Sequence, residues 1–155
     1  MSRAFVKDQD DLVTDAAERP VSPHPNLLTE RGLTLIDEEL ERLRKDLAHA
    51  MHEADRSAIS SLSRDLRYWT QRRTTAQLVP ATKDISKAAF GHRVTILRED
   101  GRRQAFTIVG EDEADPAKGY VAYVTPVARA MLGRSIGDEI DLPGGTAEIE
   151  KIEKP

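Results

Sequence analysis

The hydrophobic positions of the chain follow two periods, one helical and one extended, and the change falls near residue 90. In the first part, two series of apolar residues recur at alternating spacings of three and four, which is the seam pattern of helices packed as a coiled coil. A polar segment over residues 53–61 separates the two series, so the pattern predicts an antiparallel helical hairpin. The seams are Ile36, Leu40, Leu43, Leu47, Ala50 and Ala54, then Ile59, Leu62, Leu66, Trp69, Arg73 and Ala76.

Capping and breaking residues mark the ends of this hairpin. Thr29 is a suitable helix N-cap, and Glu30 after it places a negative charge in the first turn, where the helix dipole favours it. Pro80 cannot continue the second helix, because it lacks the backbone N–H and its ring clashes with the preceding turn. The hairpin is therefore expected over residues 29–79.

Two further segments show neither period. Residues 1–28 combine low hydrophobicity with three prolines and are predicted to be a flexible arm. Residues 80–89 begin at the helix-breaking proline, and we expect them to link the hairpin to a C-terminal domain over residues 90–155.

The C-terminal domain is predicted to be a small, mostly antiparallel sheet with one short helix. Asp100-Gly101 is a strong tight-turn signal, and Thr125 with Pro126 after it has the form of a helix start. The fold class is therefore α+β, with an N-terminal coiled-coil hairpin beside this sheet. The expected strands are residues 93–97, 104–109, 120–124, 139–142 and 147–152.

Composition narrows the class of protein. With 39% hydrophobic and 32% charged residues, the chain resembles globular proteins, and its apolar runs are too short for a membrane span or a signal peptide. We expect a cytoplasmic protein with no membrane partner. The absence of cysteine excludes disulfides, thiolate nucleophiles and cysteine-type zinc sites.

Charge argues against a nucleic-acid binder in its own right, because the net charge is −4 and phosphate contacts need clustered Lys and Arg. Residues 56–73 nevertheless carry five arginines and one acid, whereas residues 29–54 carry seven acids and four bases. Two solvated helices of complementary charge explain this distribution. A basic face directed at nucleic acid or at an acidic partner is the alternative.

Few residues could carry chemistry. The chain has no phosphate-binding glycine loop, no G-x-S-x-G elbow and no H-E-x-x-H pair, so we expect no enzyme, cofactor or small-molecule substrate. His49, His52 and Glu53 could share one helix face, but three ligands at a hairpin end make a weak metal site, so no metal is expected.

Four features follow one another in the last third of the chain, and in this order they resemble the C-terminal domain of the Gre factors, the GreA/GreB family of bacterial transcript-cleavage and elongation factors. The resemblance covers about residues 29–155 and implies an FKBP-like C-terminal domain. The features are Gly110-Glu111-Asp112-Glu113-Ala114-Asp115, Tyr123-Val124-Thr125-Pro126-Val127-Ala128-Arg129-Ala130-Met131-Leu132-Gly133, Gly137-Asp138 and Pro143-Gly144-Gly145.

The resemblance also implies a mechanism. Gre factors insert their hairpin into the secondary channel of RNA polymerase, where an Asp and a Glu at the tip help to hold a second magnesium ion for RNA cleavage. The tip candidates here are Glu53 and Asp55, but Ala58 stands where the family glutamate would stand, and Arg56 competes for either carboxylate. The hairpin also looks shorter than the family pattern by roughly two turns in each arm, about 11 Å at ~5.4 Å per turn.

We therefore expect a transcription elongation factor or modulator that binds RNA polymerase without efficient stimulation of cleavage, and whose contact with nucleic acid is indirect, within the transcription complex. The resemblance places polymerase docking at Val124, Thr125, Pro126 and Val127, although the family usually has an acidic residue where Val124 stands. Pro126 and Val127 would equally suit a plain helix start and a core position. The acidic loop at Gly110–Asp115 is expected to be solvated, with a partner-facing role as the alternative.

Three other functions stay open at this point. The first is a regulator of nucleoside diphosphate kinase, because such short-hairpin proteins share this outline. The second is an FKBP-type prolyl isomerase, which would need an aromatic-lined apolar pocket built from Phe90, Phe106, Tyr120 and Tyr123. The third is an interaction module whose hairpin pairs with another helix.

Overall fold

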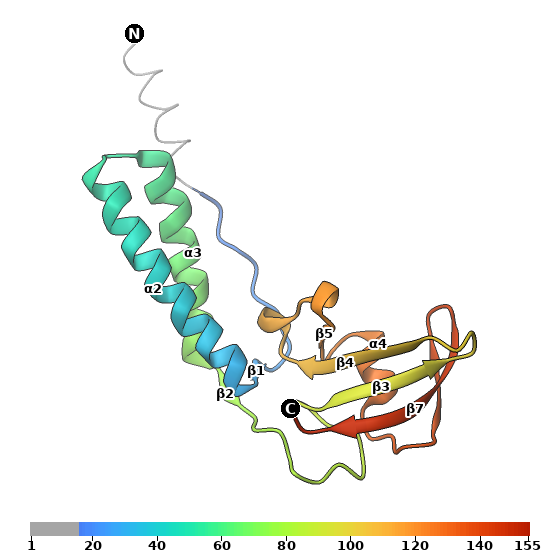
Figure 1. Cartoon of the computed structure of the whole chain (residues 1–155). Coiled ribbons are helices and arrows are strands. Elements are labelled where there is room, and N and C mark those ends of the chain that lie inside the picture. Colours follow the sequence, from blue (N-terminus) through green and yellow to red (C-terminus); the bar gives the residue numbers. More distant parts are fainter. Residues whose placement is uncertain (1–15) are drawn as a thin grey trace. The chain divides into compact units, whose positions relative to one another are not determined.

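The computed structural model describes residues 16–155 (Figure 1), so the predicted flexible arm over residues 1–28 lies partly outside the described residues. The described chain divides into two compact units. The first combines the described part of residues 1–25 with residues 34–75, and the second combines residues 26–33 with residues 76–155. In the described part, no helix has the length and apolar content to cross a membrane.

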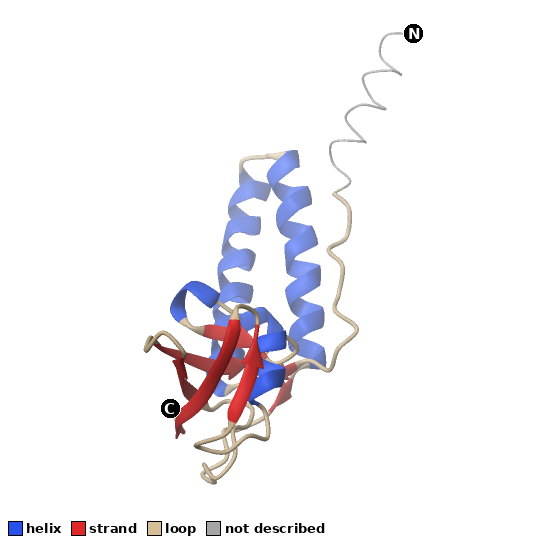
Figure 2. Cartoon of the chain, turned by 90° about the vertical axis from the view of Figure 1, so that its right-hand side faces the viewer, coloured by secondary structure: helices blue, strands red, loops and turns tan. Residues whose placement is uncertain are grey.

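The hairpin prediction is confirmed by two helices, α2 (Glu30–His52) and α3 (Arg56–Thr75), which lie side by side in Figures 1 and 2. The α2 seam is buried at its predicted positions Ile36, Leu40, Leu43 and Ala50. This apolar stripe explains why a helix with so many charged residues packs along one side.

The last seam position of α3 is a correction to the sequence pattern. Arg72, not Arg73, is buried, with 2% of its surface exposed. The buried position after Trp69 is three residues further along the helix and not four. Either spacing is possible, because residues three and four apart lie on the same helix face. Arg73 points to solvent and pairs with Asp37, with 2.7 Å between Nε and Oδ1.

The second unit is built on a curled sheet of five strands, β3 (Arg93–Arg98), β4 (Arg103–Val109), β5 (Tyr120–Ala122), β6 (Glu139–Leu142) and β7 (Gly145–Glu153). Their order in the sheet is β5-β4-β3-β7-β6. All neighbours are antiparallel except β4 and β5, which pair in parallel. Helix α4 (Pro126–Met131) buries Ala128 and Met131 in the core of this sheet. The α+β prediction is therefore confirmed.

Short strands and a buried histidine fix the segments that enter this unit. β1 (Leu27–Leu28) pairs in parallel with β2 (Gln77–Leu78). The fully buried ring of His92 accepts a hydrogen bond from the Ala89 N–H at Nδ1, 3.1 Å away, so its Nε2 carries the proton and donates to the Thr82 carbonyl at 2.8 Å. The predicted linker over residues 80–89 is thus held by specific bonds.

Candidate functional site

The hairpin tip is a helix-ending turn that runs directly into the next helix. Ala54 has the left-handed φ of 53°. Its N–H donates to the Met51 carbonyl at 3.2 Å, and the Asp55 N–H donates to the Ala50 carbonyl at 3.0 Å. This pair of bonds is the Schellman motif, with alanine at the position that usually holds glycine.

Asp55 has a structural role at this tip. Its Oδ1 accepts a hydrogen bond from the Ala58 N–H at 3.1 Å, and its carbonyl accepts from the Ile59 N–H at 2.9 Å, so Asp55 is the N-cap of α3. Glu53, two residues earlier, is exposed. Across the described residues, no group of three or more His, Asp or Glu side chains is placed to hold a metal ion, so His49 and His52 do not complete a site with Glu53.

The predicted docking loop is a rigid helix start. Thr125 Oγ1 accepts from the Ala128 N–H at 3.3 Å and donates to the Ala122 carbonyl at 2.7 Å. Pro126 occupies the first turn of α4 and is exposed, whereas Val127 is half-buried and packs against the core. Val124 is also half-buried. The loop therefore offers one exposed proline on a fixed turn.

The acidic loop contains a buried carboxylate, which corrects the expectation that the loop is solvated. The side chain of Glu113 is 1% exposed. It accepts hydrogen bonds from the Thr29 N–H at 2.9 Å, from the Thr29 hydroxyl and from the Gly110 N–H at 3.3 Å. Arg31 lies 3.8 Å from the same carboxylate. Buried carboxylates need such partners, and here all but the Gly110 N–H come from Thr29 and Arg31 at the start of α2.

Together these bonds form a helix capping box assembled from two distant segments. Thr29 is the predicted N-cap, and its Oγ1 accepts from the Gly32 N–H at 3.1 Å. In an ordinary capping box a Glu three residues after the N-cap returns a bond to the N-cap N–H. Here that position is Gly32, and Glu113 supplies the bond from the loop.

Two glycines allow the acidic loop to lie this close to Leu27 and to the first turn of α2. A Cβ built on Gly32 would lie 2.2 Å from Glu113 Oε2, and a Cβ on Gly110 would lie 2.0 Å from the Leu27 carbonyl oxygen. Both distances are far below van der Waals contact. The sequence did contain one signal of this arrangement, because Gly32 stands where a capping box would have Glu. That signal did not identify Glu113 as the residue that replaces it.

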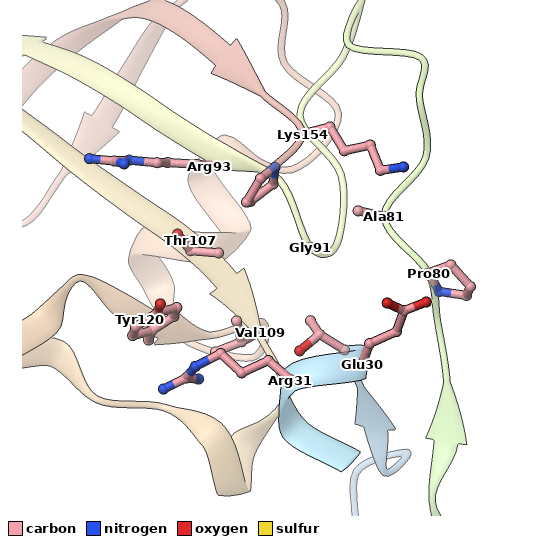
Figure 3. Close-up of a pocket in the computed structure, with 12 residues that line it drawn as sticks. Glu30, Arg31, Pro80, Ala81, Gly91, Arg93, Thr107, Val109, Tyr120 and Lys154 are labelled. Atoms are coloured by element: carbon pink, nitrogen blue, oxygen red, sulfur yellow. The ribbon is translucent and has the colours of Figure 1, made fainter. Parts of the chain in front are cut away.

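The second unit also contains a pocket of about 360 Å³ (Figure 3). Arg31 crosses the ring of Tyr120, with its guanidinium carbon 3.8 Å from the ring centre. Tyr120 is the sole aromatic residue among the described residues that line the pocket, and the cations Arg31, Arg93 and Lys154 are also in the lining. Phe90 and Tyr123 instead contact each other edge-to-face, with ring centres 5.9 Å apart. The pocket is therefore not the aromatic-lined cavity that an FKBP-type site requires.

Two exposed turn carboxylates have shifted acidities. Hydrogen bonds from Ser86 lower the pKa of Asp84, and the backbone N–H of Arg102 lowers the pKa of Asp100. Both belong to turns outside the hairpin tip and the docking loop. They stabilise local backbone geometry and do not indicate acid–base chemistry.

Comparison with known proteins gives one consistent family. Residues 82–154 match the model of the C-terminal domain of transcription elongation factors GreA/GreB. The chain is 35% identical to transcription elongation factor GreB of Pasteurella multocida, over 77% of this chain and 89% of that protein. It is 31% identical to GreB of Haemophilus influenzae, over 82% of this chain and 95% of that protein.

Solved structures of similar proteins carry the same family names. The GreA factor homolog Gfh1 of Thermus thermophilus is 20% identical, with 82% of this chain and 97% of that chain covered and a TM-score of 0.38. The transcription elongation factor GreA/GreB of Nitrosomonas europaea is 19% identical, with 81% and 95% covered and a TM-score of 0.40. On the identity to the GreB proteins and their coverage, the chain belongs to the GreA/GreB family of transcription elongation factors.

Proposed function

We propose that the chain binds RNA polymerase at its secondary channel and modulates elongation without efficient stimulation of transcript cleavage. Family membership supports the choice of transcription as the process. The observation that carries the second half of the proposal is the hairpin tip, where Asp55 caps α3 and Ala58 replaces a second carboxylate.

Cleavage assisted by a second magnesium ion requires hard oxygen ligands at a fixed distance from the scissile phosphate. Asp55 Oδ1 already accepts the Ala58 N–H. Glu53 is separated from Asp55 by Ala54, which has left-handed backbone geometry. The positive charge of Arg56 lies next in the sequence, and an ion pair with either carboxylate would compete with metal binding. A tip of this kind caps a helix and offers no prepared metal clamp.

Helix length supports the same conclusion. Helix α2 has 23 residues. At ~1.5 Å per residue it spans roughly 34 Å, and the family pattern implies about 11 Å more reach. A carboxylate displaced by two helical turns lies outside coordination distance of the active-site metal.

Docking is proposed at Val124, Thr125, Pro126 and Val127. The capped start of α4 holds Pro126 on the surface in one conformation, so binding there orders little additional backbone. Val124 lacks the charge that the family usually presents at this position. We therefore expect Val124→Asp to tighten polymerase binding, with the Val124→Asn variant as the uncharged control.

The test is binding of the full chain to core RNA polymerase, followed by a cleavage assay on a stalled, backtracked complex at ordinary magnesium. We expect binding without stimulated cleavage, and we expect Ala58→Glu, which restores the second carboxylate on short arms, to remain inactive. Stimulated transcript cleavage in the presence of the unaltered chain would contradict the proposal that its hairpin tip does not hold a second magnesium ion. An absence of binding would exclude the proposal and leave a kinase regulator or an interaction module.

A further inference from the structure

We propose that residues 16–25 form a displaceable strap that covers one face of α3 and holds the hairpin in a state with lower affinity for its partner. The strap is defined here as residues 16–25, which have no helix or strand and belong to the same compact unit as the hairpin. The inference rests on the proposed function, because the partner used to test it is RNA polymerase.

The strap is anchored by one arginine in a three-sided site on α3. The guanidinium carbon of Arg19 lies 3.9 Å from the ring centre of Tyr68 and 5.7 Å from that of Trp69. Its Nη1 is 3.5 Å from Asp65 Oδ1. Tyr68 and Trp69 meet edge-to-face with ring centres 5.1 Å apart, so the aromatic walls of the site are held in place. A guanidinium stacked on aromatic rings beside a carboxylate is a specific recognition geometry.

Two further contacts set the direction of the strap. The Ala16 N–H donates to Ser60 Oγ at 2.9 Å, and Glu18 pairs with Arg67 at 2.6 Å. The strap therefore starts near the first turns of α3 and runs in the direction of that helix, as Figures 1 and 2 show. Through Glu18 it also neutralises one of the arginines that make α3 the basic arm of the hairpin.

Composition suits this segment to an extended path. Pro20, Pro23 and Pro25 favour the extended polyproline conformation and remove three backbone donors that would otherwise need partners. Ten residues at ~3.1 Å each span roughly 31 Å, which matches the length of a 20-residue helix at ~1.5 Å per residue. A segment of this length can therefore run beside α3, and the contacts of Ala16, Glu18 and Arg19 place its first part there.

The same contacts make the strap easy to release. Within the described residues, no backbone-to-backbone hydrogen bond joins residues 16–24 to α3. The Glu18 and Arg67 side chains are 65% and 53% exposed, and exposed ion pairs contribute little to stability. Val21 is 38% exposed and is not inserted into the hairpin seam.

Release would change what the hairpin offers. A helix pair without the strap is narrower and presents the aromatic pair of Tyr68 and Trp69. Arg67 loses its Glu18 partner, while Asp65 loses Arg19 but keeps its ion pair with Arg64 at 3.1 Å. The uncovered face therefore offers aromatic rings and Arg67, which suit an acidic, enclosed surface. If the released form is about a tenth of the population, the apparent dissociation constant is about tenfold weaker than that of the released hairpin. A variant that abolishes the strap contact should recover that factor.

The first experiment measures binding of full-length variants to core RNA polymerase. We expect Arg19→Ala to bind about tenfold more tightly than the unaltered chain, with an unchanged helical circular-dichroism signal. Arg103→Ala is the matched control, because it removes an arginine from an exposed ion pair with Glu150 in the other unit. It should leave binding unchanged.

The second experiment locks the strap. The chain has no cysteine, so Ala16→Cys combined with Ser60→Cys provides one pair whose oxidation ties the strap to α3. We expect weak polymerase binding when the pair is oxidised and recovery on reduction, with each single-cysteine variant insensitive to reductant. Failure of the pair to cross-link would contradict the strap's position.

The outcomes separate this inference from the proposed function. Equal binding by the unaltered chain, Arg19→Ala and the locked form would overturn the strap while leaving polymerase binding intact. Weaker binding by Arg19→Ala would make the strap part of the docking surface, which also overturns the inference. No binding by any form, including the reduced cysteine pair, would exclude the proposed function itself.

Discussion

Replacing Glu113 by alanine is expected to destabilise the C-terminal unit far more than the same change at an exposed carboxylate of the acidic loop. The substitution removes the acceptor of the Thr29 and Gly110 backbone N–H groups, which Glu113 satisfies from a side chain that is 1% exposed. A buried donor left without a partner costs about 1–3 kcal/mol. Two such donors give roughly 2–6 kcal/mol, from which the relieved desolvation of the carboxylate is subtracted, so a loss of about 3 kcal/mol is expected.

The measurement is urea unfolding followed by far-ultraviolet circular dichroism, combined with amide hydrogen exchange at Thr29 and Gly110. These two amides should lose protection in Glu113→Ala, because they donate to the deleted carboxylate. Glu113→Gln should be intermediate, since its carbonyl oxygen still accepts one bond while its NH₂ group faces a donor. Trp69 lies in the hairpin unit, so its fluorescence serves as an internal reference for that unit.

The matched control comes from the same loop. Asp115→Ala removes a carboxylate that is 40% exposed and 3.9 Å from Lys118, and exposed pairs of this kind contribute about 0–1 kcal/mol. If both alanine variants unfold within about 0.5 kcal/mol of each other, the buried-acceptor argument is refuted. The same conclusion follows if the Thr29 and Gly110 amides keep their protection in Glu113→Ala.

Three smaller predictions follow from the local geometry. Gly32→Ala should destabilise the C-terminal unit by more than about 1 kcal/mol, although this change usually stabilises a helix. In a double-mutant cycle of urea midpoints, the loss should largely vanish in the Glu113→Ala background. An undiminished loss there would contradict the 2.2 Å clash between the new Cβ and Glu113 Oε2. Ala54→Gly should raise the melting temperature by relieving a left-handed alanine worth about 1 kcal/mol, whereas Ala50→Gly in the buried helix face should lower it, and a common sign would contradict the Schellman assignment. The pKa of Asp100 is lowered by a backbone hydrogen bond, so its stabilising contribution is present above the unfolded pKa of 3.8 and is lost as pH falls through the lower folded value. Asp100→Asn should therefore make stability depend less on pH in the acid range. An unchanged pH dependence would contradict this assignment.

The regular elements were predictable because each has a strong local signal. The seam spacing gave both helices, and Thr29 and Thr125 were recognised as N-caps from the residues around them. The strand pattern missed the two-residue strands β1 and β2, which are too short to show a period, and it misplaced some ends, such as β5 stopping at Ala122 where two more residues were expected. Those residues leave the sheet because the backbone must turn into the capped start of α4.

The long-range contacts within each unit could not be predicted in the same way. The partners Glu113 and Thr29 are 84 residues apart, and no local period links a loop carboxylate to a distant helix N-cap. The burial of Arg72 depended on whether a seam advances by three residues or by four, which spacing alone leaves open. The contacts of Arg19 lie in a segment whose composition predicted a flexible arm, because proline-rich polar stretches form no core of their own.

The two polar anchors of the molecule, the strap ion pairs and the Glu113 carboxylate, should differ in their sensitivity to salt, because one is exposed and the other is buried. The Debye length falls from about 8 Å at physiological ionic strength to about 3 Å at 1 M, which weakens exposed pairs and leaves buried ones nearly unscreened. Glu18–Arg67 and Arg19–Asp65 are exposed or half-exposed, whereas Glu113 is enclosed. Raising sodium chloride should therefore release the strap first, seen as a change in Trp69 fluorescence when Arg19 leaves the ring, while the protection of the Thr29 and Gly110 amides is kept. Simultaneous loss of both signals would mean that the strap is bound as firmly as the buried carboxylate, and a tightly bound strap could not act as a displaceable cover.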